Sequence, residues 1–246
     1  MTMPLRSILE KIKKTSPGQS LAVFDLDSTL FDLTRRVRSI MHRFLTDPAV
    51  SVKFPEAARL VHALEIRQTD WGLIEPFARL GVKPATHAEF FKAAQDAWSG
   101  GFFSNEFLSH DVPLPGAVSF VESCLAEGAH VLYLTGRDVP RMGAGTEISL
   151  RHHGFPLDGK FAELRLKPDQ THDDAKFKVE AIAEISGRYQ QIWLFENEPV
   201  NINAVLRRLP HVQTVLVETC HSGIEEVPQE AIVIENFVSH LTNEKG

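Results

Sequence analysis

Two aspartates, Asp25 and Asp27, follow a short apolar run and are separated by a single residue. The run Leu21–Phe24 is typical of a buried strand, and an extended backbone beyond it would project both carboxylates to the same side. Two acids that share a site repel each other, so one should have a raised pKa unless a cation lies between them. Such a pair suits a division of labour in which Asp25 acts as a nucleophile and Asp27 transfers a proton.

Two other interpretations of the aspartate pair are a solvated loop and a chance pairing of acids. A calcium-binding loop also begins with alternating acids, but it requires a third ligand and a glycine at its fifth and sixth positions. Thr29 and Leu30 stand at those positions, so we discard a calcium loop.

A second polar stretch, Thr135-Gly136-Arg137, comes after the apolar run His130–Leu134. A hydroxyl group and the free backbone N–H groups of a glycine-containing turn can hold a phosphoryl oxygen. The alternative is an ordinary turn between a strand and a helix, and this stretch alone does not decide between the two.

Two further stretches carry a lysine and an acid. Lys178 follows Asp173-Asp174, which opens a predicted helix, and a lysine near a helix start can add its charge to the helix dipole and attract an anion; Lys176 is the alternative lysine. Glu196 directly follows the apolar run Gln191–Phe195 and is well placed to bind Mg²⁺, which needs few carboxylates. The competing interpretation is that Glu196 or Glu198 only caps the next helix.

The elements that must position these residues alternate along the chain. Short apolar runs rich in branched residues predict strands, and helical patterns lie between them at 117–127, 178–186 and 200–209. The predicted strands are Leu21–Phe24, His130–Leu134, Glu163–Leu166, Gln191–Phe195, Val212–Val217 and Ala231–Ile234. This alternation predicts an α/β fold with a Rossmann-like parallel sheet and helices on both faces. Its functional loops should gather at the carboxyl ends of the strands.

The segment from 32 to 111 has a different pattern. Its periodicity is helical at 35–45, 56–66, 73–80 and 88–98, with proline and glycine breaks between the helices. We therefore predict a helical domain at 32–111, inserted into a core domain made of 1–31 and 112–246.

The four polar stretches, each at a predicted strand end or helix start, resemble the motifs of the haloacid dehalogenase superfamily. Asp25-Leu26-Asp27-Ser28-Thr29 resembles its first motif, and Leu134-Thr135-Gly136-Arg137 resembles its second. Lys178 resembles the third and Glu196 the fourth, although the family generally has aspartates where this chain has Glu196 and Asn197. The helical insertion resembles a cap domain placed between the first and second motifs.

This resemblance implies a magnesium-dependent phosphatase that hydrolyses a phosphomonoester. Asp25 would form an aspartyl-phosphate, and Asp27 would first protonate the leaving oxygen and then deprotonate the attacking water. The resemblance also implies that Asp25, Asp27, through its main-chain carbonyl, and Glu196 hold Mg²⁺, while Thr135, Gly136 and Lys178 bind the phosphate. The alternatives are a phosphotransferase, a phosphatase acting on nucleic-acid ends, and a phosphate-binding protein of the same fold with weakened catalysis.

The composition and charge of the chain limit the classes of partner that the protein could bind. Hydrophobic residues make up 43% of the 246 residues, which is an ordinary globular composition, and the formal net charge is −6. The absence of a basic block argues against general nucleic-acid binding, and no run of about 20 apolar residues predicts a membrane span. We expect a cytoplasmic protein that acts on a small phosphorylated metabolite.

Two groups of residues in the predicted insertion, an arginine cluster and a set of aromatic residues, each have two interpretations. Arg35, Arg36 and Arg38 predict an exposed basic helix face, and the alternative is that one of them recognises an anionic tail of the substrate. The insertion is also rich in aromatic residues. We expect most of them to pack its core and hinge, and some to line the substrate pocket.

Overall fold

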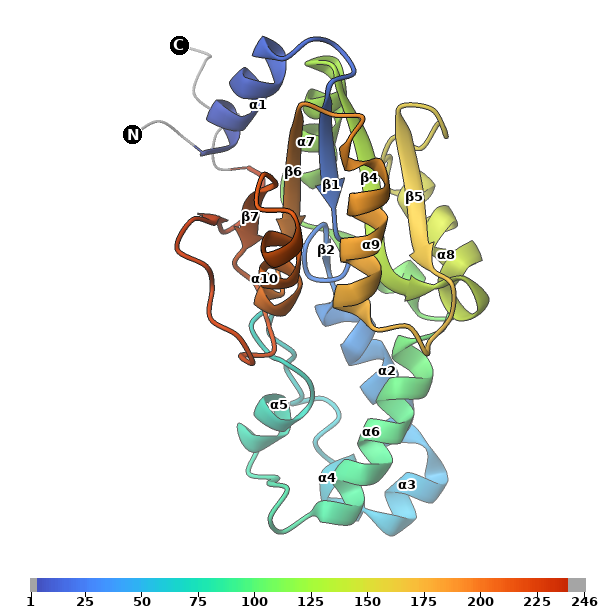
Figure 1. The fold of residues 1–246 in the computed structure, drawn as a ribbon. Coiled ribbons are helices and arrows are strands. Elements are labelled where there is room, and N and C mark those ends of the chain that lie inside the picture. The colour runs from blue at the N-terminus through green and yellow to red at the C-terminus, as the bar shows by residue number, and fades with distance from the viewer. Residues whose placement is uncertain (1–3, 239–246) are drawn as a thin grey trace, which may run out of the picture.

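A parallel sheet forms the centre of the computed structural model, which describes residues 4–238. The strand order is β5-β4-β1-β6-β7-β8, so β1 lies between β4 and β6 (Figure 1). The bounds are β1 (Ser20–Phe24), β4 (Ala129–Asp138), β5 (Ala162–Lys167), β6 (Gln191–Glu196), β7 (Gln213–Val217) and β8 (Ile232–Ile234). The predicted fold class is confirmed, and all six predicted strands are present to within a few residues.

Side chains alternate between the two faces of the sheet, and helices cover both. Ala22 and Phe24 of β1 pack in one hydrophobic cluster with α1 (Pro4–Lys14), α7 (Ala117–Ala126) and Leu150 of α8 (Val139–His152). Leu21 and Val23 pack in a second cluster with α9 (Asp174–Ser186) and α10 (Pro199–Arg208). Strands buried on both faces read as continuous apolar runs, which is why the sequence identified them.

β2 (Phe31–Asp32) and β3 (Val112–Pro113) pair antiparallel in a separate two-stranded sheet, and a helical segment, residues 33–111, lies between them in the chain. It contains α2 (Thr34–Thr46), α3 (Pro48–Lys53), α4 (Pro55–Ala58), α5 (Ile74–Ala78), α6 (Ala88–Phe102) and the 3₁₀ turn η1 (Leu108–His110). It has a hydrophobic cluster of its own, built from residues between Val37 and Phe107. Figure 1 shows this segment beyond the carboxyl ends of the strands.

One predicted helix of this segment is wrong in extent. The helix expected at 56–66 ends at Ala58, and the chain continues in turns whose hydrogen bonds span three residues, such as Leu60 N–H to Ala57 C=O (3.0 Å). These turns bring Leu64 into the hydrophobic cluster, so packing overrides helix propensity there. The sequence analysis also missed α1, α3 and α8. None of the helices in the described part of the chain is long and apolar enough to cross a membrane.

The loop after β1 is a tight turn that presents the two aspartates. The carbonyl oxygen of Leu26 accepts hydrogen bonds from the backbone N–H groups of Thr29, Leu30 and Phe31. Ser28 is the non-glycine residue with a positive φ, at 61°, among the described residues. A left-handed serine is uncommon and has a conformational cost, so it persists because its surroundings hold it in place.

Candidate active site

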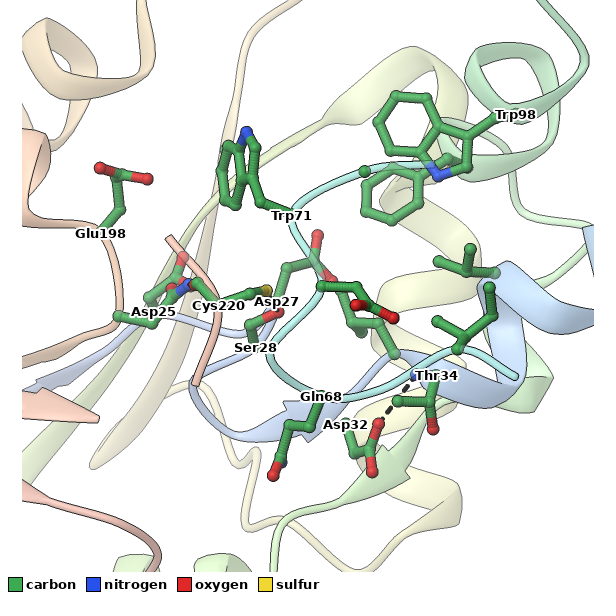
Figure 2. Close-up of a pocket in the computed structure, with 18 of the residues that line it drawn as sticks. Asp25, Asp27, Ser28, Asp32, Thr34, Gln68, Trp71, Trp98, Glu198 and Cys220 are labelled. Atoms are coloured by element: carbon green, nitrogen blue, oxygen red, sulfur yellow. Dashed lines mark hydrogen bonds between the residues drawn. The ribbon is translucent and has the colours of Figure 1, made fainter. Parts of the chain in front are cut away.

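The residues that the sequence singled out converge on one pocket of about 540 Å³. It lies between the carboxyl ends of the strands and the helical segment, and Figure 2 shows part of its lining. The six candidate residues that line it are Asp25, Asp27, Thr135, Gly136, Lys178 and Glu196. Because β1 lies between β4 and β6, parallel pairing aligns the ends of these strands, which brings residues from distant parts of the chain together.

Lys178 joins two buried carboxylates at the floor of the pocket. Its Nζ donates to Asp25 Oδ1 and to Glu196 Oε2, each at 2.6 Å. All three side chains are at most 6% exposed. Lys176, the alternative lysine, is 75% exposed and lies outside this pocket, 3.9 Å from Glu180. The structure therefore brings Lys178 to the site and not Lys176.

The charges of this trio do not balance. Burial and the repulsion from Glu196 raise the pKa of Asp25 to about 7, against the attraction of Lys178. Two carboxylates beside one ammonium group leave an uncompensated negative charge in a buried place, where a cation would be stabilised.

The donor set fits Mg²⁺, which takes one or two carboxylates and keeps several waters. No three His, Cys, Asp or Glu side chains within residues 4–238 gather as a denser metal cluster. Glu196 Oε1 accepts from the backbone N–H groups of Asn197 and Glu198, both at 3.1 Å, so this longer carboxylate is held in a fixed orientation.

Replacing Lys178 by methionine should expose this imbalance. Asp25 and Glu196 would then face each other without the ammonium, and we expect the free energy of unfolding to fall by about 1–3 kcal/mol. The loss is limited because Asp25 can take up a proton. Added Mg²⁺ should raise the melting temperature of Lys178→Met more than that of the wild type, because it supplies the missing charge. Lys176→Met is the matched control, and equal magnesium shifts in all three proteins would contradict the assignment of a cation site.

Asp27 belongs to a second ion-pair network, which two arginines share. Arg36 Nη2 and Arg137 Nη2 both donate to Asp27 Oδ1 at 2.5 Å, and Arg137 Nε donates to the same oxygen at 3.1 Å. Asp111 completes the network, with Oδ2 at 2.7 Å from Arg137 Nη2 and Oδ1 at 2.9 Å from Arg36 Nε. Arg36 and Asp111 are fully buried, whereas 26% of the Asp27 side chain remains exposed.

This network decides the charge of Asp27. Burial would raise the pKa of Asp27, but the attraction of Arg137 and Arg36 outweighs it and lowers the pKa well below the ordinary value. Asp27 is thus held as a carboxylate. Both arginines bind Oδ1, and no hydrogen bond to Oδ2 is found among the described residues, so that oxygen remains open.

The network overturns the expectation that Arg35, Arg36 and Arg38 form an exposed helix face. Arg35 and Arg38 are exposed, but Arg36 is buried and contacts protein carboxylates rather than an open space for a substrate tail. Sequence analysis missed the roles of Arg36, Arg137 and Asp111. A signal was present for Arg36, because it lies four residues before Ile40 and therefore on the apolar face of α2.

Thr135 and Gly136, near the end of β4, also line the pocket. The Thr135 side chain is buried, and its Oγ1 accepts from the backbone N–H of Arg137 at 3.2 Å. Gly136 permits a close approach, because a Cβ built on it would lie 2.6 Å from Asp174 Oδ2 at the start of α9. A side chain at this position would push the start of α9 away from the end of β4.

Glu198, and not Glu196, caps the following helix. Glu198 Oε1 accepts from the backbone N–H of Val200 at 3.3 Å, and its two oxygens also bind the N–H and hydroxyl of Ser222, each at 2.8 Å. The capping interpretation of the acidic pair is therefore correct for Glu198. Asn197 anchors the aspartate loop, since its Oδ1 accepts from Thr29 Oγ1 at 3.1 Å.

The aromatic residues of the helical segment divide into two sets. Phe77 and Phe90 are buried in its hydrophobic cluster, with ring centroids 4.9 Å apart. A second set lines the pocket and comprises Trp71, Trp98, Phe102 and Phe103. Figure 2 shows Trp71 and Trp98 in the same close-up as Asp25 and Ser28. Both expected uses of these residues are therefore observed, core packing and pocket lining.

Comparisons with known proteins identify the fold. No family model and no curated protein sequence matches this chain. Among solved structures, a candidate phosphatase from Clostridium difficile is similar with a TM-score of 0.56 and 12% identity, covering 90% of this chain and 96% of that one. A HAD-superfamily hydrolase of subfamily IA from Geobacter sulfurreducens is similar with a TM-score of 0.52 and 13% identity, over 91% and 95% of the two chains. Protein Tyrosine Kinase A of Mycobacterium tuberculosis is similar with a TM-score of 0.52 and 15% identity, covering 89% of this chain and 94% of that one.

Proposed function

We propose that this chain, which has the fold of the haloacid dehalogenase-type hydrolases, is a magnesium-dependent phosphatase acting on a small phosphomonoester. The observation that carries the proposal is the convergence of Asp25, Lys178 and Glu196 in one pocket, with a negative charge left over among them. A carboxylate can approach an anionic phosphate only when positive charge offsets their repulsion.

In this proposal Asp25 is the nucleophile. One carboxylate oxygen attacks phosphorus as the bond to the leaving oxygen breaks, which gives an aspartyl-phosphate that water then hydrolyses. Thr135, the backbone at Gly136 and Lys178 hold the phosphoryl oxygens. Asp25, the main-chain carbonyl of Asp27, and Glu196 would hold Mg²⁺. When bound, the ion supplies positive charge that offsets the repulsion between the Asp25 carboxylate and the phosphate. Lys178 Nζ already lies 2.6 Å from the nucleophile, within reach of a group attached to it.

Asp27 transfers protons through its open oxygen, Oδ2. Because the two arginines hold it ionised in the arrangement described here, Asp27 is set to accept a proton from the attacking water. To protonate the leaving group it must first take up a proton from solvent, and this requires it to give up part of its arginine contacts. Arg36 stands on α2 of the helical segment, so we propose that movement of this segment accompanies the donation. The segment 32–111 would then act as a cap that closes over the pocket and excludes water.

Metal removal tests the proposal directly. We expect the purified protein to release phosphate from a panel of phosphomonoesters in the presence of Mg²⁺, and to fall to background after chelation. Re-addition of Mg²⁺ should restore the activity, whereas Ca²⁺, which prefers 6–8 oxygen ligands, should not. Activity that survives chelation, or no activity on any ester with Mg²⁺ present, would refute the proposed chemistry.

A phosphotransferase is the second candidate, and the occurrence of this fold in a protein named as a tyrosine kinase favours keeping it. The two candidates share the attack by Asp25 and differ in the acceptor, which is water or an alcohol. Turnover in the presence of added alcohols separates them, because a transferase would yield new phosphate esters in place of free phosphate.

A further inference from the structure

The wall of the pocket that faces the aspartates is apolar and exposed. Trp71, on the loop between α4 and α5, is 51% exposed, and Ile74, at the start of α5, is 54% exposed. Both line the pocket, although large apolar side chains usually become buried. Exposed apolar surface gathered in a cleft is typical of a binding site.

Trp71 differs from the other pocket aromatics in having a free ring face. Trp98 stacks on Phe102 with centroids 4.6 Å apart, and Phe103 packs edge-on against Trp98 at 5.8 Å. No aromatic or cationic partner of Trp71 is found among residues 4–238. In Figure 2 the Trp71 indole stands apart from the Trp98 indole, on the part of the pocket nearer Asp25 and Ser28.

Two of the three basic side chains that line the described part of the pocket are held in buried ion pairs. Lys178 binds Asp25 and Glu196, and Arg137 binds Asp27 and Asp111. The third, Arg67, is 53% exposed and pairs with Glu65 at 3.2 Å. Arg67 also lies beside Asp70, which accepts from its backbone N–H at 2.7 Å. The further acids that line the pocket are Asp32, Asp70, Asp174 and Glu198.

Asp70 pairs with Arg79 and Asp174 with Lys167, but no ion pair of Asp32 or Glu198 is found among residues 4–238. The carboxylates of Asp32 and Glu198 would repel a leaving group that carries a carboxylate or a second phosphate. They can instead accept hydrogen bonds from hydroxyl groups, and the apolar wall can take a ring. The volume of about 540 Å³ accommodates a ring and a sugar together with the phosphate.

We propose that the substrate's leaving group is uncharged and carries an aromatic ring, which stacks on Trp71 while the phosphate reaches Asp25. This inference rests on the proposed phosphatase function and names the class of its substrate. Both a nucleoside 5′-monophosphate and a simple arylalkyl phosphate have this chemistry. Stacking against a tryptophan is tolerant of the identity of the ring, because every aromatic ring offers a π-face.

The test compares substrates that differ in one property each. Benzyl phosphate and cyclohexylmethyl phosphate are esters of similar alcohols and similar size, and only the first is aromatic. 3-Phosphoglycerate adds a carboxylate, and adenosine 5′-monophosphate adds a ribose. With Mg²⁺ present we expect kcat/KM for benzyl phosphate to exceed that for cyclohexylmethyl phosphate roughly tenfold, and 3-phosphoglycerate to be the poorest substrate. A higher value for adenosine 5′-monophosphate than for benzyl phosphate would identify a nucleotide as the source of the ring.

Variants of Trp71 locate the effect. Trp71→Ala should raise KM for the aromatic esters roughly tenfold and affect the cyclohexyl ester less, whereas Trp71→Phe should keep most of the preference. Phe161→Ala is the matched control, since Phe161 is 45% exposed and lies outside this pocket. It should leave every KM as it is in the wild type.

A binding measurement separates this inference from the proposed function. Calorimetric titration of the Asp25→Asn protein with benzyl phosphate and Mg²⁺, with and without Trp71→Ala, reports stacking without turnover. If the wild type hydrolysed none of these esters and Trp71→Ala still weakened binding to the Asp25→Asn protein, the phosphatase proposal would fail and the aromatic site would stand. Equal kinetics for the benzyl and cyclohexylmethyl esters, or equal losses for both in Trp71→Ala, would overturn the aromatic site and leave the phosphatase intact.

Discussion

Replacing Asp25 by asparagine is expected to lower phosphate release by roughly 10⁴-fold or more, because the amide oxygen is a poor nucleophile. The fold should survive. Asp25 is buried and has a pKa raised to about 7, so a neutral side chain of the same shape avoids the cost of burying a charge. The measurement is steady-state phosphate release with Mg²⁺, together with the melting temperature of both proteins.

Acid-quenched mass spectrometry adds a readout that is specific to the nucleophile. During turnover the wild type should gain the mass of one phosphoryl group on the peptide that contains Asp25, and Asp25→Asn should not. Asp32→Asn is the matched control: Asp32 lines the same pocket, but its Oδ1 only accepts from the backbone N–H of Thr34 at 2.8 Å. Its activity on benzyl phosphate, whose leaving group has no further hydroxyl for Asp32 to bind, should stay within a few-fold of the wild type. Retention of activity in Asp25→Asn would refute covalent catalysis by this residue.

Replacing Arg137 by methionine is expected to lower the free energy of unfolding by about 3–5 kcal/mol, because Asp27 and Asp111 would lose a buried counter-charge. Arg137 is 2% exposed, and its guanidinium contacts both carboxylates. Arg36 still contacts both acids in this variant, but one guanidinium cannot neutralise two buried carboxylates. Equilibrium unfolding in urea gives the change in free energy.

Arg6→Met is the control for the loss of an arginine. Arg6 also pairs with an acid, Glu10 at 3.4 Å, but the two side chains are 67% and 56% exposed, so its loss should cost about 0–1 kcal/mol. Combining Arg137→Met with Asp111→Asn should recover part of the lost stability, because the unpaired acid is then neutral. If the two arginine variants proved equally stable, or if the second substitution gave no recovery, the network would not stabilise the fold as we infer.

The position of this network explains why its loss should matter beyond stability. Arg36 is at the start of the helical segment, and Asp111 is at its end, next to β3. Arg137 belongs to β4 and Asp27 to the loop after β1, so the network ties both ends of the helical segment to the sheet beside Asp25. A change in the position of the segment must therefore change the surroundings of Asp27.

The strands of the sheet, and the polar residues at their carboxyl ends, can be predicted from local sequence. The strands are buried on both faces, so a continuous apolar run is enough to identify each, and parallel pairing requires their carboxyl ends to share one edge. Asp25, Thr135 and Glu196 stand at or next to those ends, which is why their convergence could be predicted. Lys178 could be predicted because Phe177, Ala181 and Ile182 pack its helix against the core, which leaves Lys178 to point toward the loops.

The partners of the charged groups and the path of the helical segment depend on contacts between distant parts of the chain. A buried arginine and a solvated one look alike in a sequence. Arg36 pairs with Asp27 and with Asp111, and Asp111 lies 75 positions further along the chain, so local sequence could not reveal this network. The early end of α4 and the exposure of Trp71 were equally hidden. Local propensity is weak beside packing in a small helical unit, and which ring faces the pocket depends on how several short helices settle against one another.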